Sequence, residues 1–278
     1  MRRGVVGFAL LAGCAGSGHA PVAPEPDARG EDTAVTIDSA SVDSAPAEAS
    51  SDAAETGPSE RRVLFIGNSY TYVNDLPAVL AKLSEASTPR LVTQSVTVGG
   101  ATLENHWTTG TATARIDEKG WYAVVLQGQS VEPILPGSTF ATYAQKLADR
   151  ATAAGAWPVF YGTWARAAGA PLYAETWSGG TPDAMQDALT AAYGAAATAG
   201  KAGIAKVGEA FRISLKERPA VVLHQTDGSH PTVAATWLAA CVFYGVLAGK
   251  PVPTTAIVPS GVSADDATWL RGVAARVL

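Results

Sequence analysis

The sequence predicts an α/β fold in which helices cover both faces of a parallel sheet of about five strands, a three-layer α/β/α sandwich. From residue 61 onward, short apolar runs alternate with longer helical patterns, which is the order typical of parallel sheets. The first run, Arg62–Ile66, is continuously apolar after its arginine, as expected of a strand covered on both faces.

A strand is expected where a short run of apolar, β-branched or aromatic residues ends near a glycine or a polar residue. The expected strands are Arg62–Ile66, Leu91–Val98, Trp121–Leu126, Trp157–Thr163 and Ile204–Val207. The loops that follow them begin at Gly67, Gly99, Gln127, Thr163 and Val207. Because ligands bind beyond the carboxyl ends of parallel strands, we expect the functional site among these loops.

Helices are expected in the longer patterns between the strands. Pro77 falls in the first turn of DLPAVLAKLSEAS, a position where proline is tolerated, and the run from Pro182 is rich in alanine. The expected helices are Asp75–Ser87, Thr139–Ala154, Pro182–Ala199, Gly208 to about Lys216, and a last long helix from near Pro231 to around Gly249.

The first fourteen residues, MRRGVVGFALLAGC, form a segment of a different kind. Arg2 and Arg3 precede an apolar run from Val5 to Leu11, which is typical of an export signal and too short to span a membrane. The closing LAGC resembles a bacterial lipobox, which implies a signal peptide at residues 1–13 and lipid attachment at Cys14. The alternative is an ordinary secretory signal cleaved near Ala20. We expect an exported protein, anchored by lipid to the bacterial cell envelope on its periplasmic or outer side.

Residues 14–60 are expected to form a disordered, acidic tether. Ala, Ser, Pro, Asp and Glu dominate this segment, which contains no aromatic residue and cannot bury enough apolar surface to fold. It holds 10 of the 25 acidic residues and one basic residue, Arg29. From Arg61 onward 17 Lys and Arg stand against 15 Asp and Glu. This near-neutral balance over residues 61–278, the expected single domain, gives no reason to expect nucleic-acid binding.

The cysteines and histidines predict neither a disulfide nor a metal site. If Cys14 is acylated, Cys241 is left without a partner within the chain. Cys241 lies in the apolar run VAATWLAACVFYGVLAG and is expected to be a buried small hydrophobe. The four histidines are scattered without ligand spacing. We therefore expect no metal and no cofactor, and we expect a monomer.

The stretch VLFIGNSYTYVNDLP, residues 63–77, runs from the first strand directly into Gly67-Asn68-Ser69-Tyr70. Serine is common where a helix begins, so Ser69 can be a helix cap. The same position is also where an α/β sheet exposes a nucleophile. The stretch by itself leaves both interpretations open.

A second motif, DGSHP at residues 227–231, precedes the last expected helix. Asp227 and His230 are three residues apart across a turn, so the carboxylate can reach one imidazole nitrogen while the other faces the site. A serine hydroxyl needs such an oriented base to attack an acyl carbon. The alternative is that Asp227 or Ser229 caps the helix and His230 has no chemical role.

These motifs together resemble the SGNH, or GDSL-type, hydrolases, a superfamily of serine esterases. GNSY at 67–70 resembles the GDSL block, and Asp227 and His230 match the spacing of the other two triad members near the C-terminus. The resemblance covers residues 62 to about 248. It implies a flavodoxin-like sheet, a triad of Ser69, His230 and Asp227, and a Gly100 that lends its N–H to an oxyanion hole. The family's Asp is Asn68 here, at a position outside the triad.

The third block departs from the family pattern of Gly-x-Asn-Asp. This chain has Gln127-Gly128-Gln129-Ser130, so Gln129 aligns with the asparagine that completes the oxyanion hole. With GGATLENHW and TWA, LQGQS resembles an uncharacterised subgroup that carries glutamine in this block. The resemblance thus implies an oxyanion hole made by the backbone N–H groups of Ser69 and Gly100 and the side-chain amide of Gln129.

The expected substrate is a small-molecule or polysaccharide ester, with an O-acetyl group on a carbohydrate favoured. Trp107 and Trp164 fall in loops on the expected active side, where aromatic faces suit sugar rings, and His106 is a further candidate contact. The alternative is that these residues pack the bases of the loops. Two other functions stay open: a glycan-binding protein of the same fold with weak or lost catalysis, and a lipase or thioesterase, which would need a long apolar groove.

Overall fold

The computed structural model describes residues 59–278. The expected signal peptide at 1–13, the expected lipid site at Cys14, and the expected tether up to residue 58 lie outside the described residues. The first strand begins at Glu60, the last residue of the expected tether.

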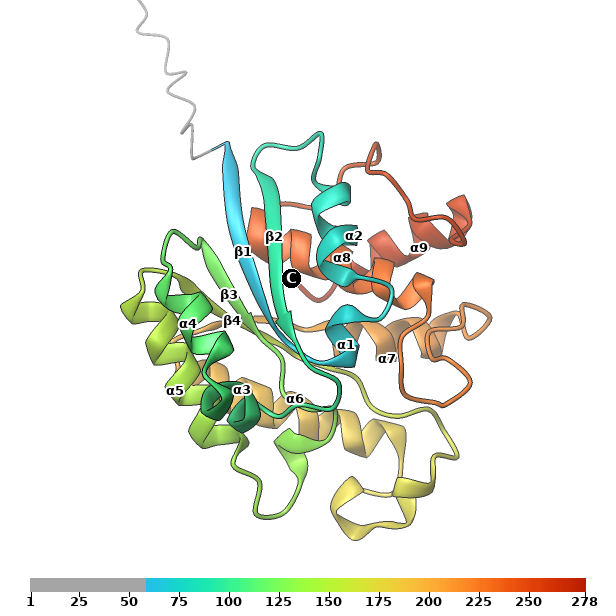
Figure 1. Ribbon diagram of the computed structural model, residues 1–278. Helices are drawn as coiled ribbons and strands as arrows, with labels where there is room; N and C mark the ends of the chain where they lie inside the picture. The colour runs from blue at the N-terminus through green and yellow to red at the C-terminus, as the bar shows by residue number, and fades with distance from the viewer. Residues whose placement is uncertain (1–58) are drawn as a thin grey trace, which may run out of the picture. The chain divides into compact units, whose positions relative to one another are not determined.

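A five-stranded sheet forms the centre of the domain (Figure 1). Its strand order is β2-β1-β3-β4-β5 and every neighbouring pair is parallel. This is the flavodoxin-like order, and it confirms the predicted fold class. The strands are β1 (Glu60–Gly67), β2 (Arg90–Thr97), β3 (Ala123–Leu126), β4 (Trp157–Tyr161) and β5 (Gly203–Ala205).

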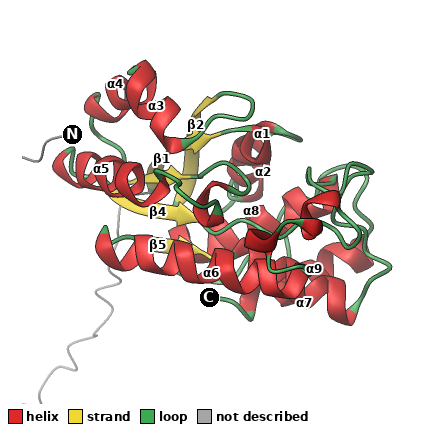
Figure 2. Ribbon diagram, turned by 90° about the horizontal axis from the view of Figure 1, so that it is seen from below, coloured by secondary structure: helices red, strands yellow, loops and turns green. Residues whose placement is uncertain are grey.

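Helices surround the sheet, as Figure 2 shows in red against the yellow strands. The first helices along the chain are α1 (Ser69–Tyr72), α2 (Leu76–Leu83), α3 (Leu103–Thr109) and α4 (Thr111–Asp117). The others are α5 (Phe140–Ala153), α6 (Pro182–Ala199), α7 (Val207–Glu217), α8 (Val233–Ala248) and α9 (Ala264–Ala275).

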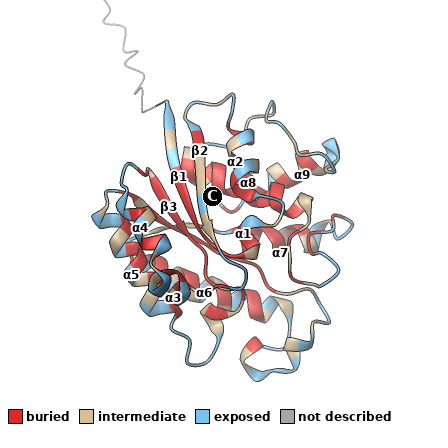
Figure 3. Ribbon diagram, viewed as in Figure 1, coloured by how far each residue is buried: buried red, intermediate tan, exposed pale blue. Residues whose placement is uncertain are grey.

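The sheet separates two hydrophobic cores, which makes the three layers of the sandwich. Alternate residues of β1 face opposite cores, because successive side chains of a strand point to opposite faces. Val63 and Phe65 belong to the core that includes residues of α2, α7, α8 and α9, whereas Leu64 and Ile66 belong to the core that includes residues of α3, α4, α5 and α6. Figure 3 shows the central strands as buried.

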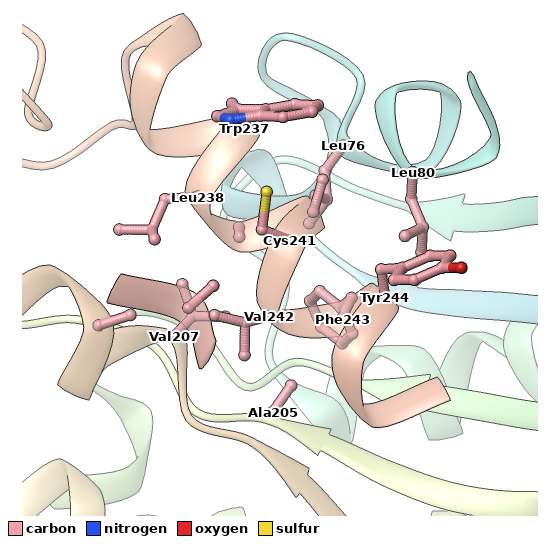
Figure 4. Close-up of a cluster of buried hydrophobic side chains, with 14 of the residues drawn as sticks. Leu76, Leu80, Ala205, Val207, Trp237, Leu238, Cys241, Val242, Phe243 and Tyr244 are labelled. Carbon is pink, nitrogen blue, oxygen red and sulfur yellow. The ribbon is translucent and has the colours of Figure 1, made fainter. Parts of the chain in front are cut away.

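Helix α8 packs in the middle of the first core, where twelve of its sixteen residues are buried. Figure 4 shows Cys241 among Leu76, Trp237 and other apolar side chains of this core. Burial raises the pKa of the Cys241 thiol far above its ordinary value. The thiol therefore stays protonated and packs as a small hydrophobe.

No helix within residues 59–278 combines the length and the apolar character that crossing a membrane requires.

Four α-helices were not among the sequence predictions: the single-turn α1 and the helices α3, α4 and α9. Both α3 and α9 begin at recognisable caps. The Thr102 side chain accepts from the N–H of Asn105 and that of Ser263 accepts from the N–H of Asp266. The long helix predicted from near Pro231 to around Gly249 is present as α8, but it is not the last helix, because α9 follows it. Helix α8 also begins later than expected, at Val233, since Thr232 is its N-cap.

Candidate active site

Ser69 lies at the first position of α1, directly after β1 and at the carboxyl edge of the sheet. The residue that caps this helix is Asn68, whose Oδ1 accepts from the N–H of Tyr70 at 3.1 Å. Ser69 is therefore not the cap, which removes one of the two interpretations of this position. Its hydroxyl instead lies 2.9 Å from Nε2 of His230.

Ser69, His230 and Asp227 form one hydrogen-bonded row. His230 Nδ1 lies 2.5 Å from Asp227 Oδ2, and its Nε2 faces the Ser69 hydroxyl. The other carboxylate oxygen of Asp227 accepts from the N–H groups of Ser229 at 2.9 Å and His230 at 3.0 Å. The hydrogen bond from His230 is the main cause that lowers the pKa of Asp227 to about 2. The carboxylate is therefore ionised at neutral pH, and it fixes the imidazole with Nε2 toward Ser69.

The loop that carries Asp227 and His230 is a tight, hydrogen-bonded turn. Gly228 has a φ of +68°, in the left-handed region that favours glycine, and its N–H donates to the carbonyl of Gln225 at 2.9 Å. The N–H of Gln225 donates to the carbonyl of His230 at 2.8 Å, and Asn74 donates to that of Pro231. These bonds hold His230 in place against α1 and the segment that follows it.

Two backbone N–H groups and one side-chain amide face the space beside Ser69. Within residues 59–278 the N–H groups of Ser69 and Gly100 donate to no protein acceptor. Oε1 of Gln129 accepts from the N–H groups of Val131 at 2.9 Å and Glu132 at 3.2 Å. Because those donors fix Oε1, the amide nitrogen of Gln129 is the atom left to donate elsewhere.

These groups line one pocket of about 520 Å³. Its walls come from the loops after β1, β2, β3 and β4 and from the turn before α8, and they include no aliphatic side chain. The lining residues are Asn68, Ser69, Tyr70, Tyr72, Gly99, Gly100, Gln129, Ser130, Arg166, Asp227, Ser229 and His230. The structure thus brings all five residues predicted for the triad and the oxyanion hole to one pocket.

A buried carboxylate joins the two loops of the predicted oxyanion hole. Glu132 accepts from the N–H of Gln129 at 2.7 Å and from the N–H of Leu103, at the start of α3, at 3.3 Å. Burial raises the pKa of Glu132, although both backbone donors act in the opposite direction. Glu132 therefore fixes the Gln129 loop relative to the segment that follows Gly100.

Gln127 and Asn68 form a reciprocal amide pair beneath the nucleophile, which the sequence did not reveal. Oε1 of Gln127 accepts from the N–H of Asn68 at 2.9 Å and from the Thr71 hydroxyl at 2.8 Å. Nε2 of Gln127 donates to Oδ1 of Asn68 at 2.8 Å and to the carbonyl of Gly128 at 2.6 Å. A Cβ on Gly67 would lie 2.5 Å from Gln127 Oε1, so only glycine leaves room for this pair.

Trp164 does not line the pocket, contrary to the sequence prediction. It is 1% exposed and stacks between Tyr70 and Phe211, with ring centroids 4.3 and 4.2 Å away. Its Nε1 donates to the carbonyl of Ser229 at 2.9 Å, while the Tyr70 hydroxyl bonds the Ser229 hydroxyl at the same distance. Trp164 therefore supports the loop of His230 from below.

His106 and Trp107 do not line the pocket either. His106 is buried with Nε2 2.8 Å from the carbonyl of Gly67, and burial lowers its pKa, so the ring is neutral and structural. Trp107 is partly buried on α3, where Lys146 and Arg150 of α5 lie over its ring. For these residues the packing alternative was right, because they lie on α3 and their side chains pack against the core.

Arg166 is a lining residue that the sequence reasoning missed. It follows β4, at the same edge of the sheet as Ser69. Its Nη2 donates to the Ser130 hydroxyl at 2.7 Å, and the guanidinium lies 5.9 Å from the centroid of the Tyr70 ring. TWAR at 163–166, with an arginine in the loop that follows β4, was the available signal. Within the described residues no three His, Cys, Asp or Glu side chains gather as a metal site would require.

Comparisons with known proteins found similarity among solved structures. No family model matches the sequence, and no curated protein matches it. A structure from Slackia heliotrinireducens assigned to the SGNH hydrolases is 33% identical, with 66% of this chain and 97% of that chain covered and a TM-score of 0.58.

Two more distant structures share the fold. One is a DUF4886 family protein from Bacteroides uniformis, 17% identical, covering 78% of this chain and 94% of that chain, with a TM-score of 0.64. The other is a catalytic mutant of an acetylxylan esterase from Geobacillus stearothermophilus, 15% identical, covering 67% and 94%, with a TM-score of 0.52.

Proposed function

This chain belongs to the SGNH hydrolases, and we propose that it is a serine esterase that cleaves O-acyl esters through Ser69, His230 and Asp227. The similarity to that family supports a hydrolase of esters in general. The observation that carries the specific proposal is the row of hydrogen bonds from Asp227 through His230 to Ser69, beside a pocket with uncommitted donors.

In the first half of the proposed reaction, Oγ of Ser69 attacks the ester carbonyl carbon. Nε2 of His230 takes the hydroxyl proton, for which it is placed at 2.9 Å, and then gives that proton to the leaving alcohol. Asp227 holds the imidazole in the tautomer with hydrogen on Nδ1 and stabilises the imidazolium that forms. The product of this half is an acyl group on Ser69.

In the second half, water attacks the acyl group and His230 again serves as base and then acid. Both halves place negative charge on the former carbonyl oxygen, and the N–H groups of Ser69 and Gly100 with the Gln129 amide are the donors that would receive it. Loss of one such donor typically raises the barrier by about 3 kcal/mol. The bonds from Val131 and Glu132 to Gln129 support this role, because they keep the amide nitrogen turned away from its own loop.

A small acyl group, with acetyl favoured, is the proposed substrate feature. The pocket is lined by polar, glycine and tyrosine residues and offers no aliphatic wall for a long acyl chain, which argues against the lipase alternative. One of the structures with this fold is an acetylxylan esterase, and that activity is known of that protein. The aromatic residues that favoured a sugar alcohol in the sequence do not line the pocket, so they lend the carbohydrate no support.

The direct test is hydrolysis of p-nitrophenyl acetate and butyrate by the wild-type protein and by Ser69→Ala. Ser260→Ala, at an exposed loop serine, is the matched control. We expect Ser260→Ala to retain the wild-type rate and Ser69→Ala to lose it, with acetate preferred over butyrate. Near-background rates in both folded wild type and Ser69→Ala would reject the esterase and favour the glycan-binding alternative.

A further inference from the structure

The pocket beside Ser69 contains a cation that has no anionic partner in the part of the chain that the structure describes. Arg166 lines it together with Gln129 and His230. No carboxylate of residues 59–278 lies within 4.0 Å of its guanidinium, whereas Arg150 and Arg212, also at partly exposed positions, are paired with one and two carboxylates respectively. Asp227 is the acidic residue of the pocket wall, and its oxygens are already occupied by His230 and two backbone N–H groups.

The guanidinium is held in place although its charge is not neutralised. Nη2 donates to the Ser130 hydroxyl, and the carbonyl of Arg166 accepts from the Tyr173 hydroxyl at 2.6 Å. Nε is buried and finds no acceptor among the described residues. A partly buried charge without a partner is costly, since ionised groups removed from water are normally paired. A protein that retains one in a binding pocket has the means to bind an anion there.

We propose that the substrate carries a carboxylate near the scissile ester and that Arg166 binds it. This inference rests on the proposed esterase function and names the substrate class of the same site. A guanidinium presents a planar fork of N–H donors that fits a carboxylate in two parallel hydrogen bonds. The carboxylate can belong to the acyl part, as in the half-ester of a dicarboxylic acid, or to the alcohol part, as in an acetylated uronic acid.

The first arm of the test needs no variant. Two matched pairs of esters are compared by kcat/KM: monoethyl succinate against ethyl butyrate, and an acetylated methyl glucuronoside against the corresponding glucoside. We expect a preference of roughly 10- to 100-fold for the anionic member of one pair, the range of a charge-assisted hydrogen bond. The pair that shows the preference identifies the part of the substrate that carries the charge. A ratio near one in both pairs overturns the inference while leaving the esterase intact.

The second arm assigns the preference to Arg166. In Arg166→Gln the ratio should fall to about one, and in Arg166→Lys part of it should remain. In Arg115→Gln, at a partly exposed arginine of α4 outside the pocket, it should be unchanged. If Arg166→Gln lowers kcat/KM equally for both esters of a pair, Arg166 serves the reaction or the fold and does not bind the substrate carboxylate. That outcome overturns the inference. If Arg166→Gln does not fold, Arg166→Lys and the wild-type ratio decide.

A separate measurement covers the case in which the protein hydrolyses no ester. Calorimetric titration of Ser69→Ala with succinate and with glucuronate then tests the anion site directly. Binding that is lost in Ser69→Ala combined with Arg166→Gln supports the site although the proposed function has failed. Binding of neither carboxylate overturns the inference as well.

Discussion

Gln127→Glu tests whether the amide pair beneath the nucleophile depends on the donor half of that side chain. The new carboxyl group has the size of the amide and keeps the oxygen that accepts from Asn68 N–H and the Thr71 hydroxyl. It replaces an NH₂ group that donates to Asn68 Oδ1 and to the Gly128 carbonyl. When ionised, it places an oxygen against two acceptors at a position that is fully buried.

The expected loss of stability follows from keeping this carboxyl protonated. A neutral carboxyl can donate to one of the two acceptors, so one acceptor stays unsatisfied at a cost of about 1 kcal/mol. Protonating a group with a reference pKa near 4.3 costs about 3.7 kcal/mol at pH 7 and about 1 kcal/mol at pH 5. The free energy of unfolding should therefore fall by about 4–5 kcal/mol at pH 7 but only about 2 kcal/mol at pH 5.

The free energy of unfolding of Gln127→Glu should decrease as pH rises. The folded variant binds a proton that the unfolded chain releases above the reference pKa, so its stability decreases as pH rises. Urea denaturation of wild type, Gln127→Glu and the control Gln145→Glu, at a partly exposed position of α5, at pH 5 and 7 measures it. A loss in Gln127→Glu that is the same at both pH values, or no larger than in Gln145→Glu, would refute the amide-pair reasoning.

Three further predictions concern the triad, its support and the buried thiol. Asp227→Asn keeps the oxygen that accepts from the two backbone N–H groups but loses the ionised partner of His230. The kcat should therefore fall by roughly 10³–10⁴-fold while the circular dichroism spectrum stays unchanged. A loss below tenfold would contradict the assigned role. Trp164→Ala removes a ring stacked on both faces, and urea denaturation should show a loss of about 3–5 kcal/mol, a loss under 1 kcal/mol being inconsistent with this packing. In a Cys14→Ser protein, Cys241 should react with a maleimide only in denaturant, because the folded thiol is buried and its pKa is raised. Labelling of the native protein at the rate of free cysteine would contradict this.

The order of the sheet explains how much of the site the sequence could predict. Ser69 follows β1 and Gln129 follows β3, and these strands are neighbours in space at the point where the strand order reverses. Alternating strands and helices are enough to predict a parallel sheet, so the edge that carries the site could be predicted from loop positions. The pairing of Asp227 with His230 was also predictable, because three residues across a turn bring the two side chains within reach.

The direction of side chains within those loops could not be predicted in the same way. Trp164 directly follows the buried Thr163 at the carboxyl edge of the sheet. Its ring nevertheless stacks under Tyr70, because Phe211 of α7 offers a second flat face. Arg166, two residues later, turns instead toward Ser130 and the pocket. The direction of the Trp164 ring depends on partners 40 or more positions away in the sequence, and the direction of Arg166 depends on the loop that follows β3. The local sequence contains neither kind of information.

The register between β1 and β3 makes the nucleophile loop and the third-block loop one structural unit. Ile66 is paired with Leu126, so Gly67 lies level with Gln127 and the residues that follow both strands diverge from the same point. Gln127 can then reach Asn68 only across the space that a side chain on Gly67 would fill. A glycine at the end of β1 is therefore a requirement of the glutamine at the end of β3. The placement of Ser69 depends on a residue of the third block at least as much as on its own helix cap.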